Sequence, residues 1–156
     1  MIIVADTSAL YAAFDSSQLE HAAALDVMET QALAISPLVI TELDHLVHRD
    51  LGFSAAMQIM EALNARIVDG QYKLADLRAA DLTAVHEIRA KYEGLQLDLA
   101  DAVGVVLADR YKTDRIFTLD QRDFRAITPL TSGISAFRIL PADGATAPEP
   151  RGHTKR

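Results

Sequence analysis

Short apolar runs alternate along the chain with longer segments in which apolar residues recur at helical spacing. The runs are typical of buried strands and cover residues 2–5, 32–35, 66–69 together with 72–75, 115–119 and 136–140. The segments between them have the length of helices and cover roughly residues 8–14, 17–30, 37–50, 54–64, 76–92 and 99–111. Strands that alternate with helices favour a parallel sheet covered on both faces. The pattern therefore predicts an α/β fold, a single-domain α/β/α sandwich with a central parallel sheet.

The two ends of the chain differ in composition. The strand and helix pattern occupies residues 1–140, and a chain of 156 residues that is 50% hydrophobic has the size of one domain. Residues 141–156 contain three of the five prolines and no large apolar side chain. We expect residues 141–156 to be a disordered or loosely packed C-terminal tail.

Composition also narrows the class of protein. The chain has no cysteine, which is compatible with the cytoplasm, and no run of the roughly 20 apolar residues that a membrane helix needs. We therefore expect a cytoplasmic protein with no membrane partner. The net charge of −7 argues against a broad basic surface for nucleic acid. It does not exclude a nucleic-acid enzyme, because a divalent cation among clustered acids reverses the local field.

Two of the predicted strands end in an aspartate. Asp6 follows residues 2–5, and Asp120 follows residues 115–119. Ligands of open α/β sheets bind at the carboxyl ends of the strands. One such aspartate could simply cap the next helix. Two at corresponding positions indicate a site at that edge of the sheet.

Further acids lie on predicted helices. Glu42 sits at the edge of the apolar arc of the helix over residues 37–50. It could be a boundary residue paired with Arg49, or it could be functional. Asp98 and Asp101 open the helix over residues 99–111, where Asp98 is a natural N-cap and is expected to act as a cap rather than a ligand. The side chain of Asp101 should point over the first turn.

These acids form a candidate site of oxygen ligands. Its members are Asp6, Glu42, Asp101 and Asp120, with Asp98 near them. Carboxylates this close would repel one another unless a cation neutralised them. Oxygen ligands alone favour Mg²⁺ or Mn²⁺ over zinc. A carboxylate-held Mg²⁺ suits phosphoryl chemistry.

Four short motifs carry a family resemblance. They are ADTSAL at 5–10, TELDHL at 41–46, DLADAVGVVLA at 98–108 and TLDQRDF at 118–124. In this order they resemble the acidic motifs of PIN-domain proteins, particularly the VapC toxins of toxin–antitoxin pairs, over residues 2–140. The resemblance implies a PIN-like α/β/α fold and a Mg²⁺-dependent endoribonuclease in which Mn²⁺ substitutes. It also implies a homodimer and a cognate VapB-type antitoxin of a type II toxin–antitoxin system.

The resemblance also implies roles for individual residues. Asp6, Glu42, Asp101 and Asp120 would be catalytic and would hold the metal, with Asp98 as a possible additional ligand. Ser8 and Thr118 match the hydroxyls that hold these acids in place. Asp123 is expected to cap or pair locally. Candidates for contacts with the RNA backbone are Arg49, Arg122 and Arg125.

Two other readings compete with a nuclease. A phosphatase or phosphotransfer domain also places aspartates at strand ends, but here no second acid stands two residues after Asp6, where Ser8 is found. A non-catalytic PIN-like binding module would lack one or more of the four acids, and all four are present. The sequence does not indicate which RNA would be the substrate.

Overall fold

The computed structural model describes residues 1–144, which form one parallel five-stranded sheet. The strands are β1 (Ile3–Ala5), β2 (Leu33–Ile35), β3 (Tyr72–Leu74), β4 (Arg115–Phe117) and β5 (Arg138–Leu140). Their order across the sheet is β3-β2-β1-β4-β5, and every neighbouring pair is parallel. The central strand β1 therefore lies beside β4, and their carboxyl ends meet at one edge. The predicted α/β/α sandwich is confirmed.

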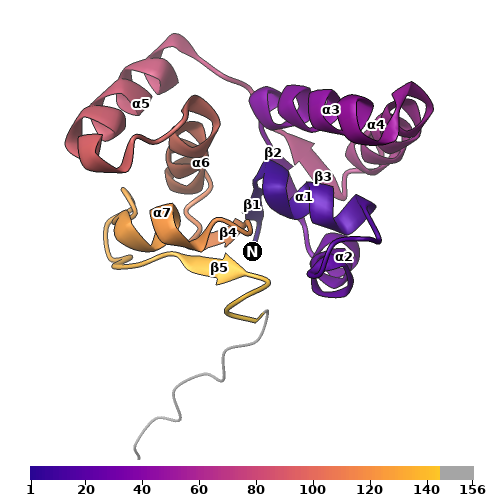
Figure 1. The fold of residues 1–156 in the computed structure, drawn as a ribbon. Coiled ribbons are helices and arrows are strands. Elements are labelled where there is room, and N and C mark those ends of the chain that lie inside the picture. Colours follow the sequence, from indigo (N-terminus) through magenta and orange to yellow (C-terminus); the bar gives the residue numbers. More distant parts are fainter. Residues whose placement is uncertain (145–156) are drawn as a thin grey trace, which may run out of the picture.

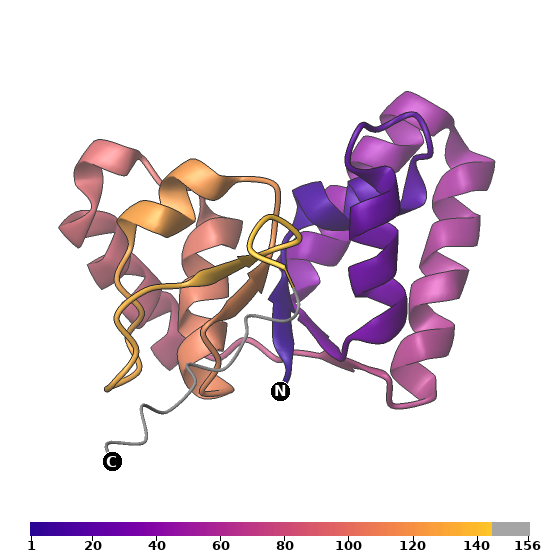
Figure 2. The ribbon, with the colours of Figure 1, turned by 90° about the horizontal axis from the view of Figure 1, so that it is seen from below.

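Two groups of helices cover the two faces of this sheet (Figures 1 and 2). The first group is α1 (Thr7–Phe14), α2 (His21–Thr30), α3 (Pro37–Leu51) and α4 (Phe53–Val68). The second is α5 (Ala79–Lys91), the short 3-10 helix η1 (Glu93–Leu95), α6 (Leu99–Arg110) and α7 (Gln121–Ala126). None of the helices among residues 1–144 is long and apolar enough to cross a membrane.

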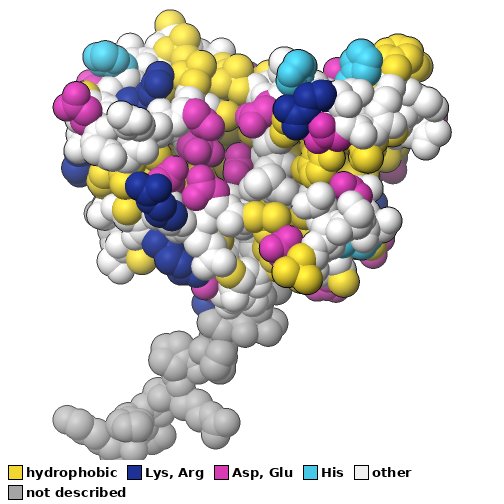
Figure 3. All heavy atoms as spheres, viewed as in Figure 1, with side chains coloured by type: hydrophobic (Ala, Val, Ile, Leu, Met, Phe, Trp, Pro, Cys, Tyr) yellow, Lys and Arg dark blue, Asp and Glu magenta, His cyan; other side chains and the backbone are white. Residues whose placement is uncertain are grey.

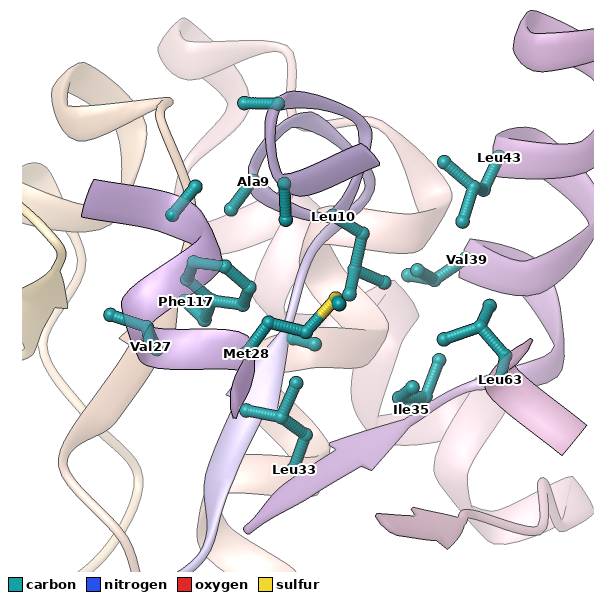
Figure 4. Close-up of a cluster of buried hydrophobic side chains, with 14 of the residues drawn as sticks. Ala9, Leu10, Val27, Met28, Leu33, Ile35, Val39, Leu43, Leu63 and Phe117 are labelled. Atoms are coloured by element: carbon teal, nitrogen blue, oxygen red, sulfur yellow. The ribbon is translucent and has the colours of Figure 1, made fainter. Parts of the chain in front are cut away.

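Alternating strand residues divide the core into two clusters. Ile3, Leu33 and Phe117 point toward α1–α4, where they pack with side chains such as Leu10 and Leu63 (Figure 4). The strand residues at the alternate positions point toward the second group of helices; they include Val4, Ile116 and Ile139. This period of two is what a sheet buried on both faces requires. The packing fixes the sheet edge on which the acids lie.

The structure differs from the predicted elements at residues 66–69. This run is the last turn of α4 and the residue after it, not a strand, because Ile59, Leu63 and Ile67 continue one helical face into the core. In that turn, the Arg66 guanidinium donates to the carbonyl of Met28 on α2 at 3.1 Å. The strand begins only at Tyr72. A short apolar run gives no period long enough to separate these two outcomes.

The link that follows β5 is tied to the domain. The Asp143 carboxylate accepts a hydrogen bond from the Ile139 N–H at 2.8 Å and pairs with Arg125 at 2.7 Å. Residues 141–144 are thus held against α7. The remainder of the expected tail, residues 145–156, lies outside the described residues, so a boundary at residue 140 stays a prediction.

Candidate metal centre

A pocket of about 210 Å³ opens at the carboxyl ends of β1 and β4. Its lining residues are Asp6, Thr7, Ser8, Glu42, Leu46, Asp98, Asp101 and Asp120. Figure 3 shows acidic side chains gathered on this face, in the region between α3 and α6 in Figure 1. The structure thus brings together all five acids that the sequence singled out.

Asp6 stands at the N-cap position of α1, but its side chain makes no cap hydrogen bond. The Thr118 hydroxyl donates to Asp6 Oδ2 at 2.7 Å, and the Ser8 hydroxyl donates to the same oxygen at 3.2 Å. The two hydroxyls are also 3.2 Å apart. This arrangement orients one carboxylate oxygen of Asp6. The two hydroxyls that the resemblance singled out therefore contact an acid of the site.

The segment after β4 is held by the same two hydroxyls. The Asp120 N–H donates to Thr118 Oγ1 at 3.0 Å, and the Leu119 N–H donates to Ser8 Oγ at 3.0 Å. The Asp6 N–H donates to the Phe117 carbonyl at 2.8 Å and closes the β1–β4 ladder. Backbone and hydroxyl contacts together fix Asp120 relative to Asp6, although the two residues are far apart in the sequence.

The first turn of α6 supplies the next two acids. Asp98 is the N-cap, and its carboxylate accepts from the Asp101 N–H at 2.8 Å. Asp101 is 8% exposed. Burial raises its pKa to about 8, and repulsion from Asp6, Asp98 and Asp120 contributes in the same direction. Near neutral pH, Asp101 must therefore either carry a proton or have the negative charge of its carboxylate balanced by a cation.

Asp123 also lies beside these acids, although its place in the sequence predicted only a local role as a cap or pairing partner. One carboxylate oxygen of each of Asp101, Asp120 and Asp123 can be chosen so that all three lie within 4.8 Å of one another. Burial raises the pKa of Asp123, and Asp120 adds to the shift. The available signal was the Asp-x-x-Asp spacing of 120 and 123 at the start of α7, which repeats that of 98 and 101.

Glu42 reaches the mouth of the pocket from α3. The Ser36 hydroxyl caps this helix by accepting from the Val39 N–H at 3.3 Å, and Pro37 is its first residue. Desolvation raises the pKa of Glu42, the Thr7 hydroxyl opposes that rise, and Asp98 adds to it. The alternative pairing with Arg49 is not formed, because Arg49 binds Asp50 at 2.7 Å.

The donor set of this pocket fits a hard divalent cation. Its acids offer oxygen atoms only, which suits Mg²⁺ or Mn²⁺. Thr7 provides a separate observation: it is 3% exposed, and its hydroxyl lies near Glu42 but makes no hydrogen bond of regular geometry among the described residues. Buried hydroxyls are nearly always well paired, so this one supports a further polar group in the pocket. Asp6, Asp101 and Asp120 would hold such an ion.

The three arginines that are candidates for contact with RNA differ in whether their side chains are already bound to the protein itself. Arg125 binds Asp143 and the side chain of Gln121, which anchors it to the protein itself. Arg49 is occupied by Asp50. Arg122 is exposed on α7 near Asp123, whose pKa it lowers. Figure 3 shows basic side chains beside the acidic cluster, over the position of α7. Of the three, Arg122 is best placed to meet a phosphate.

The sequence matches the PIN domain over residues 3–128, so the chain belongs to the PIN-domain family. It is 38% identical to ribonuclease VapC26 of Mycobacterium tuberculosis over 141 residues, which are 89% of this chain and 100% of that protein. This relative confirms the resemblance to VapC proteins that the four motifs indicated.

Solved structures show the same fold at lower identity. The structure of Mycobacterium tuberculosis VapC20, described as a toxin that cleaves the sarcin–ricin loop, matches with a TM-score of 0.68 and 18% identity, over 78% of this chain and 92% of that one. A chain of Rickettsia felis VapBC2 bound to a promoter DNA fragment matches with a TM-score of 0.63 and 17% identity, over 89% and 98%.

Proposed function

We propose that the protein is a Mg²⁺-dependent endoribonuclease that acts as the toxin of a type II toxin–antitoxin pair. The observation that carries this proposal is the convergence of Asp6, Glu42, Asp101 and Asp120 on one pocket, with hydroxyls that orient Asp6. Membership of the PIN-domain family and the ribonuclease name of the M. tuberculosis relative support it.

The reaction would be hydrolysis of a phosphodiester bond. When bound, Mg²⁺ would polarise the scissile phosphate and lower the pKa of a water molecule. Glu42, whose pKa is already raised, would orient that water and accept its proton. The water oxygen bonds to phosphorus as the P–O3′ bond breaks. The products are then a 5′-phosphate and, after protonation of the departing oxygen, a 3′-hydroxyl.

The partners follow from the same proposal. RNA would be the substrate, and a cognate VapB-type antitoxin would inhibit the enzyme. Structures of a VapBC complex and of a toxin–antitoxin complex from Klebsiella pneumoniae share this fold, which supports an antitoxin partner. A homodimer and a cytoplasmic location stay predictions.

The test is RNA cleavage by the purified protein with Mg²⁺, with Mn²⁺ and with EDTA. Wild type should cleave only with a divalent ion, and Glu42→Gln should lose about 100-fold or more of the rate if Glu42 is the general base. Asp44→Asn is the matched control, because Asp44 is an exposed acid two residues away on the same helix. Cleavage that persists in EDTA, or equal loss in both variants, would contradict the proposal. A folded wild type that never cleaves RNA would favour the binding module.

A further inference from the structure

A second, larger pocket of about 380 Å³ lies on the other side of the segment that carries Asp120. Its lining residues are Leu19, Glu20, Ala23, Thr118, Leu119, Gln121, Pro141 and Ala142. They come from the turn before α2, the first turn of α2, the link between β4 and α7, and the residues after β5. The pocket is therefore at the same edge of the sheet as the acids. We call it the β4–β5 pocket.

The two pockets share a wall. Thr118 lines the β4–β5 pocket and also donates to Asp6 at 2.7 Å. Leu119 lines it too, and its N–H is bound to Ser8 in the acidic pocket. If an RNA strand has one phosphate over the acids, a neighbouring nucleotide needs only to cross this wall to enter the β4–β5 pocket. The base of that nucleotide can therefore reach the pocket.

The chemistry of the β4–β5 pocket differs from that of the acids. Leu19, Leu119 and Pro141 give it apolar walls, and neither lysine nor arginine lines it. Its polar side chains are Glu20, Thr118, which is already bound to Asp6, and Gln121, whose Oε1 accepts from Arg125 and whose amide N–H groups stay available. A carboxylate without a cation repels phosphate, so the pocket suits an uncharged flat group with a polar edge. Its volume falls in the range of roughly 300–1,000 Å³ that is typical of small-molecule sites.

Leu19 adds a separate indication that something covers this pocket. It is 95% exposed, more than any other large hydrophobic side chain among residues 1–144. A leucine held on a turn at the mouth of an apolar pocket would lose that exposure when a planar ligand packs beneath it. Unstacked bases are bound in this way, between apolar or aromatic side chains and with polar groups at the base edge.

We propose that the β4–β5 pocket binds the base of a nucleotide that flanks the cleaved phosphate. The inference rests on the proposed ribonuclease activity and deepens it, because it assigns part of the sequence preference to a specific cavity. The base leaves the stack of the single strand and enters between Leu19 and Pro141. Glu20 and Gln121 then contact its edge.

The experiment maps cleavage of total bacterial RNA by sequencing the new 5′ ends. Ala23→Trp fills the pocket from α2, and Ala142→Trp fills it from the opposite wall should the first variant fold poorly. Ala90→Trp is the matched control, an exposed alanine that lines a separate pocket beside η1. Mn²⁺ affinity is measured on every variant by calorimetry. The affinity of Ala23→Trp should match that of wild type, because Ala23 does not line the acidic pocket.

Wild type and Ala90→Trp should prefer one base at a single position next to the cut, by about fivefold or more, because hydrogen bonds to a base edge discriminate against the wrong base. Filling the pocket should reduce that preference below about twofold without changing Mn²⁺ affinity. An unchanged preference in the filled variants, or no preference in wild type, would overturn the inference while the nuclease stands. If filling the pocket weakened the binding of a protein partner and left RNA binding unchanged, the inference would also be overturned. Absence of any cleavage by wild type would instead refute the proposed function.

Discussion

Replacement of Asp101 by asparagine should stabilise the metal-free protein. Asp101 is 8% exposed, and burial together with four neighbouring aspartates raises its pKa from 3.8 to about 8. A carboxyl group whose pKa is raised in the folded state binds its proton more tightly there than in the unfolded chain. Its contribution to stability is therefore lost as the pH rises toward the folded pKa.

The magnitude follows from the size of that shift. Linkage gives a cost of about 4 kcal/mol at pH 7 for a pKa that moves from 3.8 to about 8, and solvent screening leaves on the order of 2 kcal/mol. The free energy of unfolding of Asp101→Asn should thus exceed that of wild type by about 2 kcal/mol at pH 7. The difference should be small near pH 4, where Asp101 is neutral in the folded state and only about half ionised in the unfolded chain, and should grow up to about pH 8.

The assay is urea unfolding in EDTA at several pH values between 4 and 8. The pH dependence of the difference between the two proteins isolates Asp101, because the other titrating groups are common to both. Excess Mn²⁺ should reverse the order, since the ion stabilises the protein that binds it. If Asp101→Asn were less stable than wild type in EDTA, or if the difference did not depend on pH, the reasoning would be refuted.

Four further substitutions test separate parts of the structure. Thr7→Val should stabilise the metal-free protein by about 1 kcal/mol and weaken Mn²⁺ binding about tenfold, with Thr7→Ser close to wild type; unchanged affinity in Thr7→Val would count against the hydroxyl. Asp98→Ser keeps a cap for α6 and should leave Mn²⁺ affinity within about threefold, whereas a tenfold loss would make Asp98 a ligand. Asp123→Asn should weaken Mn²⁺ binding about tenfold in calorimetry, and no change would exclude it from the site. Phe117→Ala should cost about 3–5 kcal/mol in urea unfolding, against less than about 0.5 for the exposed Phe53→Ala; similar losses would contradict the assigned core.

The sequence predicted the fold well where burial dictates the pattern. The buried strands around Ile3 and Phe117 are apolar on both faces, as a covered parallel sheet requires, and their parallel direction follows from the alternation with helices. Residues 66–69 were mistaken for a strand because a four-residue run carries no period. The helix α7 was not expected, since its six residues include one buried apolar side chain, Phe124.

The site was predictable in its membership but not in its geometry. Strand ends and caps mark Asp6, Asp98 and Asp120 in the sequence. The pairing of β1 with β4, which places Thr118 on Asp6, depends on contacts between residues more than 100 positions apart. The place of Asp123 beside Asp101 and Asp120 depends on helix α7, which the sequence pattern did not predict.

In the proposed enzyme, the acids at the ends of β1 and β4 hold the divalent ion that RNA cleavage requires. The most direct measurement is anomalous diffraction from a crystal of the protein soaked in Mn²⁺. A peak is expected within about 2.5 Å of carboxylate oxygens of Asp6, Asp101 or Asp120. A peak held by other residues, or none in a crystal whose acidic pocket is open to the soak, would contradict it.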